Sequence, residues 1–117
     1  MRRTQFDRIV DEALEELPDW VLDVVDNLHV VVEDWPTREQ DPDDDGILGI
    51  YEGISLLERG DFYSGALPDR IVIFMGPHLD LGLRRAELRS EIRKTVLHEV
   101  AHHLGIDDDR LAELGWD

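Results

Sequence analysis

The sequence predicts a fold that combines α-helices with a few short β-strands. Apolar residues recur at helical spacing near the N-terminus, over Thr4–Leu17, and again over a longer stretch near the C-terminus, 84–104. Between these stretches, β-branched residues gather in three short runs, as they do in strands. The length of 117 residues suits one ordinary domain, so we expect residues 1–117 to form a single domain.

Two amphipathic helices frame the chain. The first is predicted over Thr4–Leu17 and is ended or redirected by Pro18, after which a short helix or turn is expected in "DWVLDVV". The second, over 84–104, carries an unbroken i, i+4 apolar stripe, typical of a helix packed on a core. Its members are Leu88, Ile92, Val96, Val100 and Leu104. Gly105 follows where a left-handed helix cap favours glycine, and a last short helix is predicted in "DDDRLAELG".

Three strands are predicted between these helices. They are "LHVVVE" (28–33), "ILGIYE" (47–52) and "RIVIFM" (70–75), the last with the strongest pattern. A long exposed loop with two prolines and an acid cluster separates the first two. An irregular connection with three glycines and a proline separates the last two.

Composition excludes several classes of function. With 28 acidic against 12 basic residues, the formal charge is −16, so phosphates of nucleic acids or anionic membranes would be repelled. The chain has no cysteine, so any metal must be held by His, Asp or Glu. The N-terminus lacks the apolar region of a signal peptide, and no apolar run approaches the roughly 18 residues of a membrane span. We therefore expect a cytoplasmic protein.

The long helix carries an H-E-x-x-H motif, formed by His98, Glu99 and His102. Residues four apart lie one turn apart on the same helix face, with Cβ atoms about 5–6 Å apart. Two imidazoles so placed can bind one Zn²⁺ at roughly 2.0–2.1 Å each. Glu99 is rotated by about 100° from His98. It can therefore accept a proton from a zinc-activated water that attacks a carbonyl, which is the chemistry of a metallopeptidase.

The motif extends to H-E-x-x-H-x-x-G-x-x-D, because Gly105 and Asp108 follow His102 at intervals of three residues. A turn at Gly105 would bring the chain back toward the metal. Asp108 has the register of a third ligand, but Asp107 and Asp109 stand beside it, and aspartate also caps helices. The alternative interpretation of the motif is a pair of incidental surface histidines.

Segments along the whole chain resemble the small bacterial zincin-like metallopeptidases. They are "EALEELP", "VVVEDWP", "LGIYEGISLLER", "LPDRIVIF" and, most specifically, "TVLHEVAHHLGIDDDRLAELG". The resemblance implies an α+β, minimal zincin-like fold. In it a small mixed β-sheet packs on a long active-site helix, with an N-terminal helix and a short C-terminal helix. It also implies that His98, His102 and Asp108 bind zinc and that Glu99 is the catalytic base. In zincins an edge strand above this helix often pairs with an extended substrate, a role that "ILGIYE" would suit.

The chain also departs from larger zincins. Neither methionine follows Asp108, so the methionine turn of metzincins is missing. With nine residues after Asp108, we expect no C-terminal subdomain. The walls of the substrate pocket are therefore expected from loops before the long helix or from a partner chain.

Further polar residues have two interpretations each. His103 is expected to be solvated or to lie behind the residues of the site, and the alternative is that it orients Glu99 or a substrate carbonyl. His78 is expected to be a plain loop histidine, or else to lie near the cleft. His29, within a predicted strand, is expected to be structural. Four more side chains either stabilise an oxyanion or serve packing and ion pairing; they are Tyr51, Tyr63, Arg59 and Arg70.

A second metal motif, "DPDDDGILGIYE", matches the pattern of an EF-hand calcium loop from Asp41 to Glu52. An EF-hand needs a helix on each side of its loop. Here Pro36 and Pro42 precede or interrupt the motif, and Gly49 and Gly53 weaken any exiting helix. We therefore expect a solvated acidic turn joined to a strand.

Together these features predict a zinc-dependent metallopeptidase that acts on peptides or flexible protein segments. The alternatives are a zinc-binding pseudopeptidase or regulatory module without hydrolytic activity and, less favoured, a calcium-binding protein. The sequence does not indicate an oligomeric state.

Overall fold

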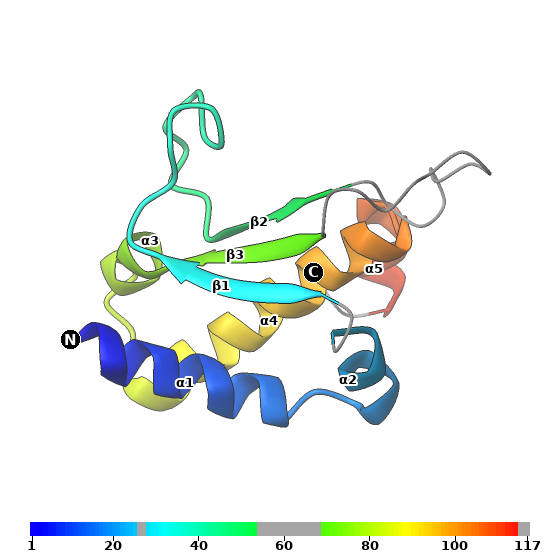
Figure 1. Cartoon of the computed structure of the whole chain (residues 1–117), viewed down its shortest axis with the longest axis horizontal. Coiled ribbons are helices and arrows are strands. Elements are labelled where there is room, and N and C mark those ends of the chain that lie inside the picture. The colour runs from blue at the N-terminus through cyan, green and yellow to red at the C-terminus, as the bar shows by residue number, and fades with distance from the viewer. Residues whose placement is uncertain (26–27, 54–68, 115–117) are drawn as a thin grey trace.

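Helices at both ends of the chain enclose a small β-sheet in the computed structural model, which describes residues 1–25, 28–53 and 69–114 (Figure 1). In chain order the elements are α1 (Arg3–Glu15), α2 (Asp19–Val25), β1 (His29–Glu33), β2 (Gly49–Glu52), β3 (Arg70–Phe74), α3 (Met75–Asp80), α4 (Arg85–Leu104) and α5 (Asp108–Leu114). This arrangement confirms the predicted α+β class. No helix in the described parts of the chain has the length and apolar character that a membrane span requires.

The sheet is mixed and has the order β1-β3-β2. β1 pairs with β3 in parallel, from His29 opposite Arg70 to Glu33 opposite Phe74. β2 pairs with β3 antiparallel, from Gly49 opposite Ile73 to Glu52 opposite Arg70. Among the described residues no strand lies on the other side of β2, so β2 is an edge strand.

The hydrophobic core lies between the sheet and two helices that cover one of its faces, α1 and α4 (Figure 1). β3 is central and contributes Ile71 and Ile73, both fully buried. Each buried side chain of this size contributes about 1.5–3 kcal/mol to folding. The helices supply most of the remaining cluster, namely Phe6, Ile9, Val10 and Ala13 from α1 and Leu88, Ile92, Val96, Leu97 and Val100 from α4. This cluster fixes α4 beneath the sheet.

α4 has a second buried stripe beside the apolar one, and this stripe is polar. Thr95, Glu99 and His103 recur at i, i+4 and are buried, with exposed fractions of 8%, 5% and 5%. They face the sheet, because Gly49 of β2 lies directly against Thr95 and Glu99. α4 therefore places Glu99, the predicted catalytic base, against the sheet.

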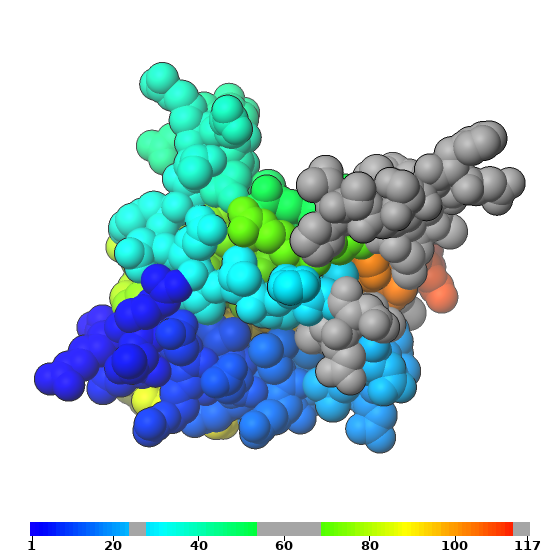
Figure 2. Space-filling view, viewed as in Figure 1, coloured from blue at the N-terminus to red at the C-terminus, as the bar shows by residue number. Residues whose placement is uncertain are grey.

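The elements follow the predicted order, with one addition. Residues 75–80 form a short helix, α3, where the sequence predicted a loop around "GPHLD". Pro77 is compatible with it because the first turn of a helix has no use for that N–H. The strand predicted at 47–52 begins only at Gly49. The connection between β1 and β2 rises away from the sheet as a narrow projection (Figures 1 and 2).

Candidate metal centre

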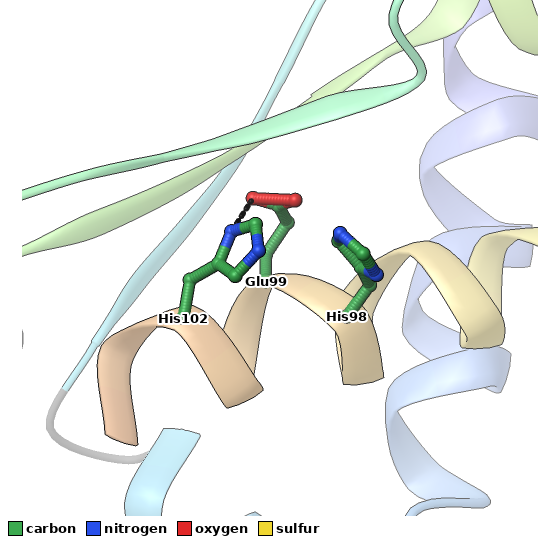
Figure 3. Close-up of side chains that lie close together, drawn as sticks. All are labelled: His98, Glu99 and His102. Atoms are coloured by element: carbon green, nitrogen blue, oxygen red, sulfur yellow. Dashed lines mark ion pairs between the residues drawn. The ribbon is translucent and has the colours of Figure 1, made fainter. Parts of the chain in front are cut away.

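His98, Glu99 and His102 converge near the end of α4. Figure 3 shows the three side chains projecting from one side of the helix, with Glu99 between the two imidazoles. One ligand atom from each residue lies within 4.8 Å of the other two, and the ring centroids of the histidines are 4.5 Å apart. Two donors at roughly 2.0–2.1 Å from one tetrahedral ion are themselves about 3.3 Å apart. The arrangement is therefore close to what a metal ion requires.

The Glu99 carboxylate is buried and incompletely satisfied. Its side chain is 6% exposed, and its Oε2 lies 3.5 Å from His102 Nδ1, which is an ion-pair separation too long for a good hydrogen bond. Among the described residues Oε2 has no hydrogen-bond partner. Buried carboxylate oxygens are nearly always hydrogen-bonded, so this atom indicates a place where a further polar group binds.

A turn after α4 brings Asp108 to the same side. Gly105 adopts the left-handed conformation, with φ of 79°. The N–H of Gly105 donates to the His102 carbonyl at 3.0 Å and that of Ile106 to the Ala101 carbonyl at 2.8 Å, a Schellman motif that reverses the chain. Asp108 Oδ1 then lies 3.9 Å from His102 Nε2. The predicted glycine turn is confirmed.

The neighbouring aspartate has a different task. Asp107 Oδ1 accepts the backbone N–H of Arg110 at 2.9 Å, so Asp107 caps the start of α5. Asp109 is exposed in the first turn of that helix. Of the three consecutive aspartates, Asp108 is the one whose carboxylate lies beside an imidazole of the motif.

The acidic surroundings favour the protonated form of His102. Its contact with Glu99 is the largest influence and raises the pKa of the imidazole above its ordinary value. Burial opposes this effect, and the negative charges of Glu99 and Asp108 add to it. A cation is therefore stabilised at this position, whether a proton or a metal ion supplies the charge.

A cavity of about 390 Å³ adjoins His98 and Glu99. One wall is the chain that enters β2, residues 46–49, and the other is α4, through Glu91, Lys94, Thr95, His98 and Glu99. One wall of this cavity thus comes from a segment before the long helix, where the walls of the substrate pocket were expected.

The chain also matches a family of known proteins. The sequence model of the zincin-like metallopeptidase family matches residues 25–116. The chain belongs to this family. The match confirms the resemblance noted from the sequence and covers the whole H-E-x-x-H-x-x-G-x-x-D segment.

A solved structure shows that this zincin-like fold occurs elsewhere. A conserved hypothetical protein from T. thermophilus aligns with a TM-score of 0.59 and 24% sequence identity, over 99% of this chain and 100% of that one. At this identity the likeness concerns the fold alone. No curated protein matches the chain.

In this zincin-like protein, two buried networks flank Glu99 along the polar stripe of α4. On one side, His78 donates from Nδ1 to the Phe74 carbonyl at 2.8 Å, and its Nε2 lies 3.0 Å from Thr95 Oγ1. Burial lowers the pKa of His78, although the bond to Phe74 and the charge of Glu91 oppose this shift. The prediction of a loop histidine was wrong, because His78 lies in α3 and is fully buried.

On the other side of Glu99, His103 Nδ1 lies 3.1 Å from Asp69 Oδ2 and 3.0 Å from the Tyr51 hydroxyl. The prediction of a solvated His103 was therefore wrong, since its side chain is 6% exposed. Sequence reasoning did not find Asp69 or Thr95. The recurrence of Thr95, Glu99 and His103 at i, i+4 was an available signal for Thr95, but none pointed to Asp69.

The remaining candidates serve other contacts. The Tyr51 hydroxyl is engaged by His103. Arg70 forms an ion pair with Glu52 at 2.9 Å. His29 is an exposed residue at the start of β1. Arg59 and Tyr63 lie outside the described residues.

The two parts of the calcium-like motif make different contacts in the structure. The Asp41 carboxylate is buried and accepts the backbone N–H groups of Asp45 at 2.9 Å and Gly46 at 3.0 Å, so it holds the turn together. Glu52 lies in β2, bonded to Gln40 and Arg70. Within the described residues the group His98, Glu99 and His102 is the one found with metal-binding spacing. These contacts agree with the expected acidic turn followed by a strand.

Proposed function

We propose that this zincin-like protein is a zinc-dependent peptidase in which His98, His102 and Asp108 hold the metal and Glu99 is the general base. The observation that carries the proposal is Glu99 Oε2, a buried carboxylate oxygen without a hydrogen-bond partner among the described residues, beside two imidazoles. Leaving such an oxygen unsatisfied costs about 1–3 kcal/mol or more, so its retention is best explained by a ligand that binds there.

The donor set supports zinc. Two imidazoles and one carboxylate leave a coordination position open, which is the pattern of catalytic rather than structural zinc sites. The chain has no cysteine that would close the site. When bound, zinc supplies an acidified water, with a pKa near about 7, and polarises the carbonyl of the scissile bond.

Glu99 is the proposed general base. Its buried carboxylate lies 3.5 Å from His102 Nδ1, beside the proposed metal ligands, and in this proposal it does not bind the ion itself. From there it accepts a proton from the attacking water and passes it to the leaving amine. Among the described residues no hydrogen-bond donor occupies Oε2, so this oxygen is available to accept the proton.

The edge of β2 supports a peptide substrate. The Leu48 carbonyl accepts the Phe74 N–H at 3.0 Å, so Leu48 and Phe74 form a hydrogen-bonded pair of the antiparallel ladder. Because such pairs alternate, the backbone N–H and C=O groups of Gly49 and Tyr51 point to the open edge. An extended peptide would pair there and pass above Glu99, which lies against Gly49.

Paired measurements on the wild type and Glu99→Gln test this function. Each protein is loaded with zinc, its metal content is measured, and it is incubated with a diverse peptide library whose products are mapped by mass spectrometry. We expect about one zinc per chain in both proteins and cleavage by the wild type only. His98→Ala serves as the variant that loses both zinc and turnover.

Two outcomes would redirect the assignment. Unchanged cleavage by Glu99→Gln would remove the general-base role. Full zinc occupancy with no cleavage by the wild type would favour the alternative, a zinc-binding module without hydrolytic activity. Unaltered zinc binding in His98→Ala would show that the metal lies elsewhere.

A further inference from the structure

Lys94 is the only lysine of the chain, which otherwise uses eleven arginines as its basic residues. It lies on the wall of the cavity beside His98 and Glu99. Lys94, His98 and His102 follow one another at i, i+4 and i+8, so they share one face of α4. The face that carries the motif histidines therefore also carries a cation one turn before them.

The Lys94 ammonium has no ion-pair partner among the described residues. Five arginines do form ion pairs within the described residues; they are Arg3, Arg70, Arg85, Arg89 and Arg110. Glu91 is the other charged residue of the cavity wall before the motif. Its negative charge acts to raise the pKa of His78, against the larger effect of burial. In a chain of formal charge −16, an exposed cation left unpaired at a cavity is available to a ligand.

We propose that Lys94 binds a carboxylate of the peptide substrate, in the segment that extends from the metal centre toward the amino end of α4. This inference rests on the proposed peptidase function and specifies its substrate class. Lysine suits the task because its ammonium is a compact point charge on a flexible stem, which can reach carboxylates in several positions.

The direction of β2 defines which part of the substrate meets Lys94. Residues 46–49 lie near Lys94 and Thr95, and Tyr51 lies near His103, so β2 runs in the same direction as α4. A peptide that pairs with β2 in the slightly more stable antiparallel sense runs the opposite way. The residues that follow the scissile bond then approach Lys94.

The distances limit the position of the carboxylate to a few residues. Along the helix axis Lys94 lies about 6 Å from His98 and about 12 Å from His102, at roughly 1.5 Å per residue. The midpoint of the two histidines is thus about 9 Å away, or about three residues of an extended peptide at roughly 3.3 Å each. An Asp or Glu side chain within the first three residues after the scissile bond would reach Lys94, and so would the terminal carboxylate of a peptide that ends there.

Peptide binding to zinc-loaded Glu99→Gln tests the inference without requiring turnover. Fluorescence anisotropy is measured for matched peptides with Glu or Gln at each position, each with a free or an amidated C-terminus. The Lys94→Gln and Lys94→Arg changes are added to Glu99→Gln. Arg84→Gln, added in the same way, is the matched control. It removes the same charge from an exposed position ten residues earlier in the chain, about 15 Å along the helix axis.

We expect a carboxylate to tighten binding roughly five- to tenfold, as a charge-assisted contact of about 1–1.4 kcal/mol would. This preference should disappear in Lys94→Gln and persist in Lys94→Arg and Arg84→Gln. A preference that vanishes on amidation identifies the chain end as the source, and one that follows Glu identifies a side chain. Equal preference in Lys94→Gln, equal loss in Arg84→Gln, or no preference in any peptide would overturn the inference.

The two proposals fail separately. Cleavage of the library by the wild type without any preference for carboxylates leaves the peptidase function intact and refutes the role of Lys94. Carboxylate-dependent binding through Lys94, in a protein that cleaves nothing, supports the role of Lys94 in binding and refutes the peptidase.

Discussion

Replacing Gly49 by alanine would test how closely β2 lies on α4, the helix that carries the candidate metal centre. A Cβ atom at this position would lie 2.6 Å from Thr95 Cγ2, 3.0 Å from the Val72 carbonyl oxygen and 3.7 Å from Glu99 Cγ. Thr95 cannot easily turn away, because its hydroxyl is held between His78 Nε2 and the Glu91 carbonyl, each at 3.0 Å. The added methyl group must therefore push β2 and α4 apart.

The size of the effect follows from two opposing terms. Overpacking of this kind costs about 1–3 kcal/mol. Alanine also lowers the conformational entropy of the unfolded chain, which stabilises the protein by about 0.4–1 kcal/mol. We expect a net loss of about 1–2 kcal/mol, which lowers Tm by roughly 4–8 °C in a domain of this size. Urea unfolding and thermal melts of the metal-free protein measure this loss.

A double-mutant cycle identifies the clash. Thr95→Ser removes Cγ2 but keeps the hydroxyl that bonds His78 and the Glu91 carbonyl. The double variant should therefore recover at least about 0.5 kcal/mol relative to the sum of the single changes. Wild-type stability in Gly49→Ala, or strict additivity in the double variant, would show that β2 does not lie against Thr95 and Glu99 in this way.

Two further predictions concern the buried networks and the acidic turn. Because burial lowers the folded-state pKa of His78, the unfolded chain binds the proton more readily, and stability should fall as pH decreases below about 6.5. The free energy of unfolding is measured by urea titration of chelator-treated wild type and His78→Asn at pH 7.5 and 5.5. It should fall less between the two pH values in His78→Asn than in the wild type, and an equal fall would contradict this. Millimolar calcium should leave Tm unchanged, whereas Asp41→Ala should lower stability by about 1–3 kcal/mol through the loss of its bonds to the turn. A calcium-dependent rise of Tm that Asp41→Ala abolishes would restore the calcium interpretation.

Local patterns predicted most of the elements, and the exception has a local cause. The apolar stripe from Leu88 to Val100 and the glycine at 105 are features of a single helix and its end, so the sequence displays them directly. α3 was missed because Gly76 and Pro77 lie in its first turn. A proline is unfavourable in the interior of a helix but harmless at its start, and "GPHLD" does not show which applies.

The H-E-x-x-H motif could be predicted from the sequence for the same reason, because His98, Glu99 and His102 lie within one helix. The residues around Glu99 could not be predicted in this way, since Gly49, Tyr51 and Asp69 come from segments some 30 to 50 residues away in the chain. Only the order of strands in the sheet brings them to α4. The register of the motif already favoured Asp108 among three consecutive aspartates, and the structure adds that Asp108 lies near His102 whereas Asp107 caps α5.

Zinc affinity measures whether His98, His102 and Asp108 hold one zinc ion, as we propose. Competition titrations compare the wild type with Asp108→Ala and with Asp107→Ala, which removes an equal charge from the capping residue next to it. We expect Asp108→Ala to weaken zinc binding by more than roughly 100-fold, beyond the roughly 10–100-fold that losing a hydrogen-bond partner of a ligand costs, and Asp107→Ala to keep near wild-type affinity. Wild-type affinity in Asp108→Ala, or an equal loss in Asp107→Ala, would contradict it.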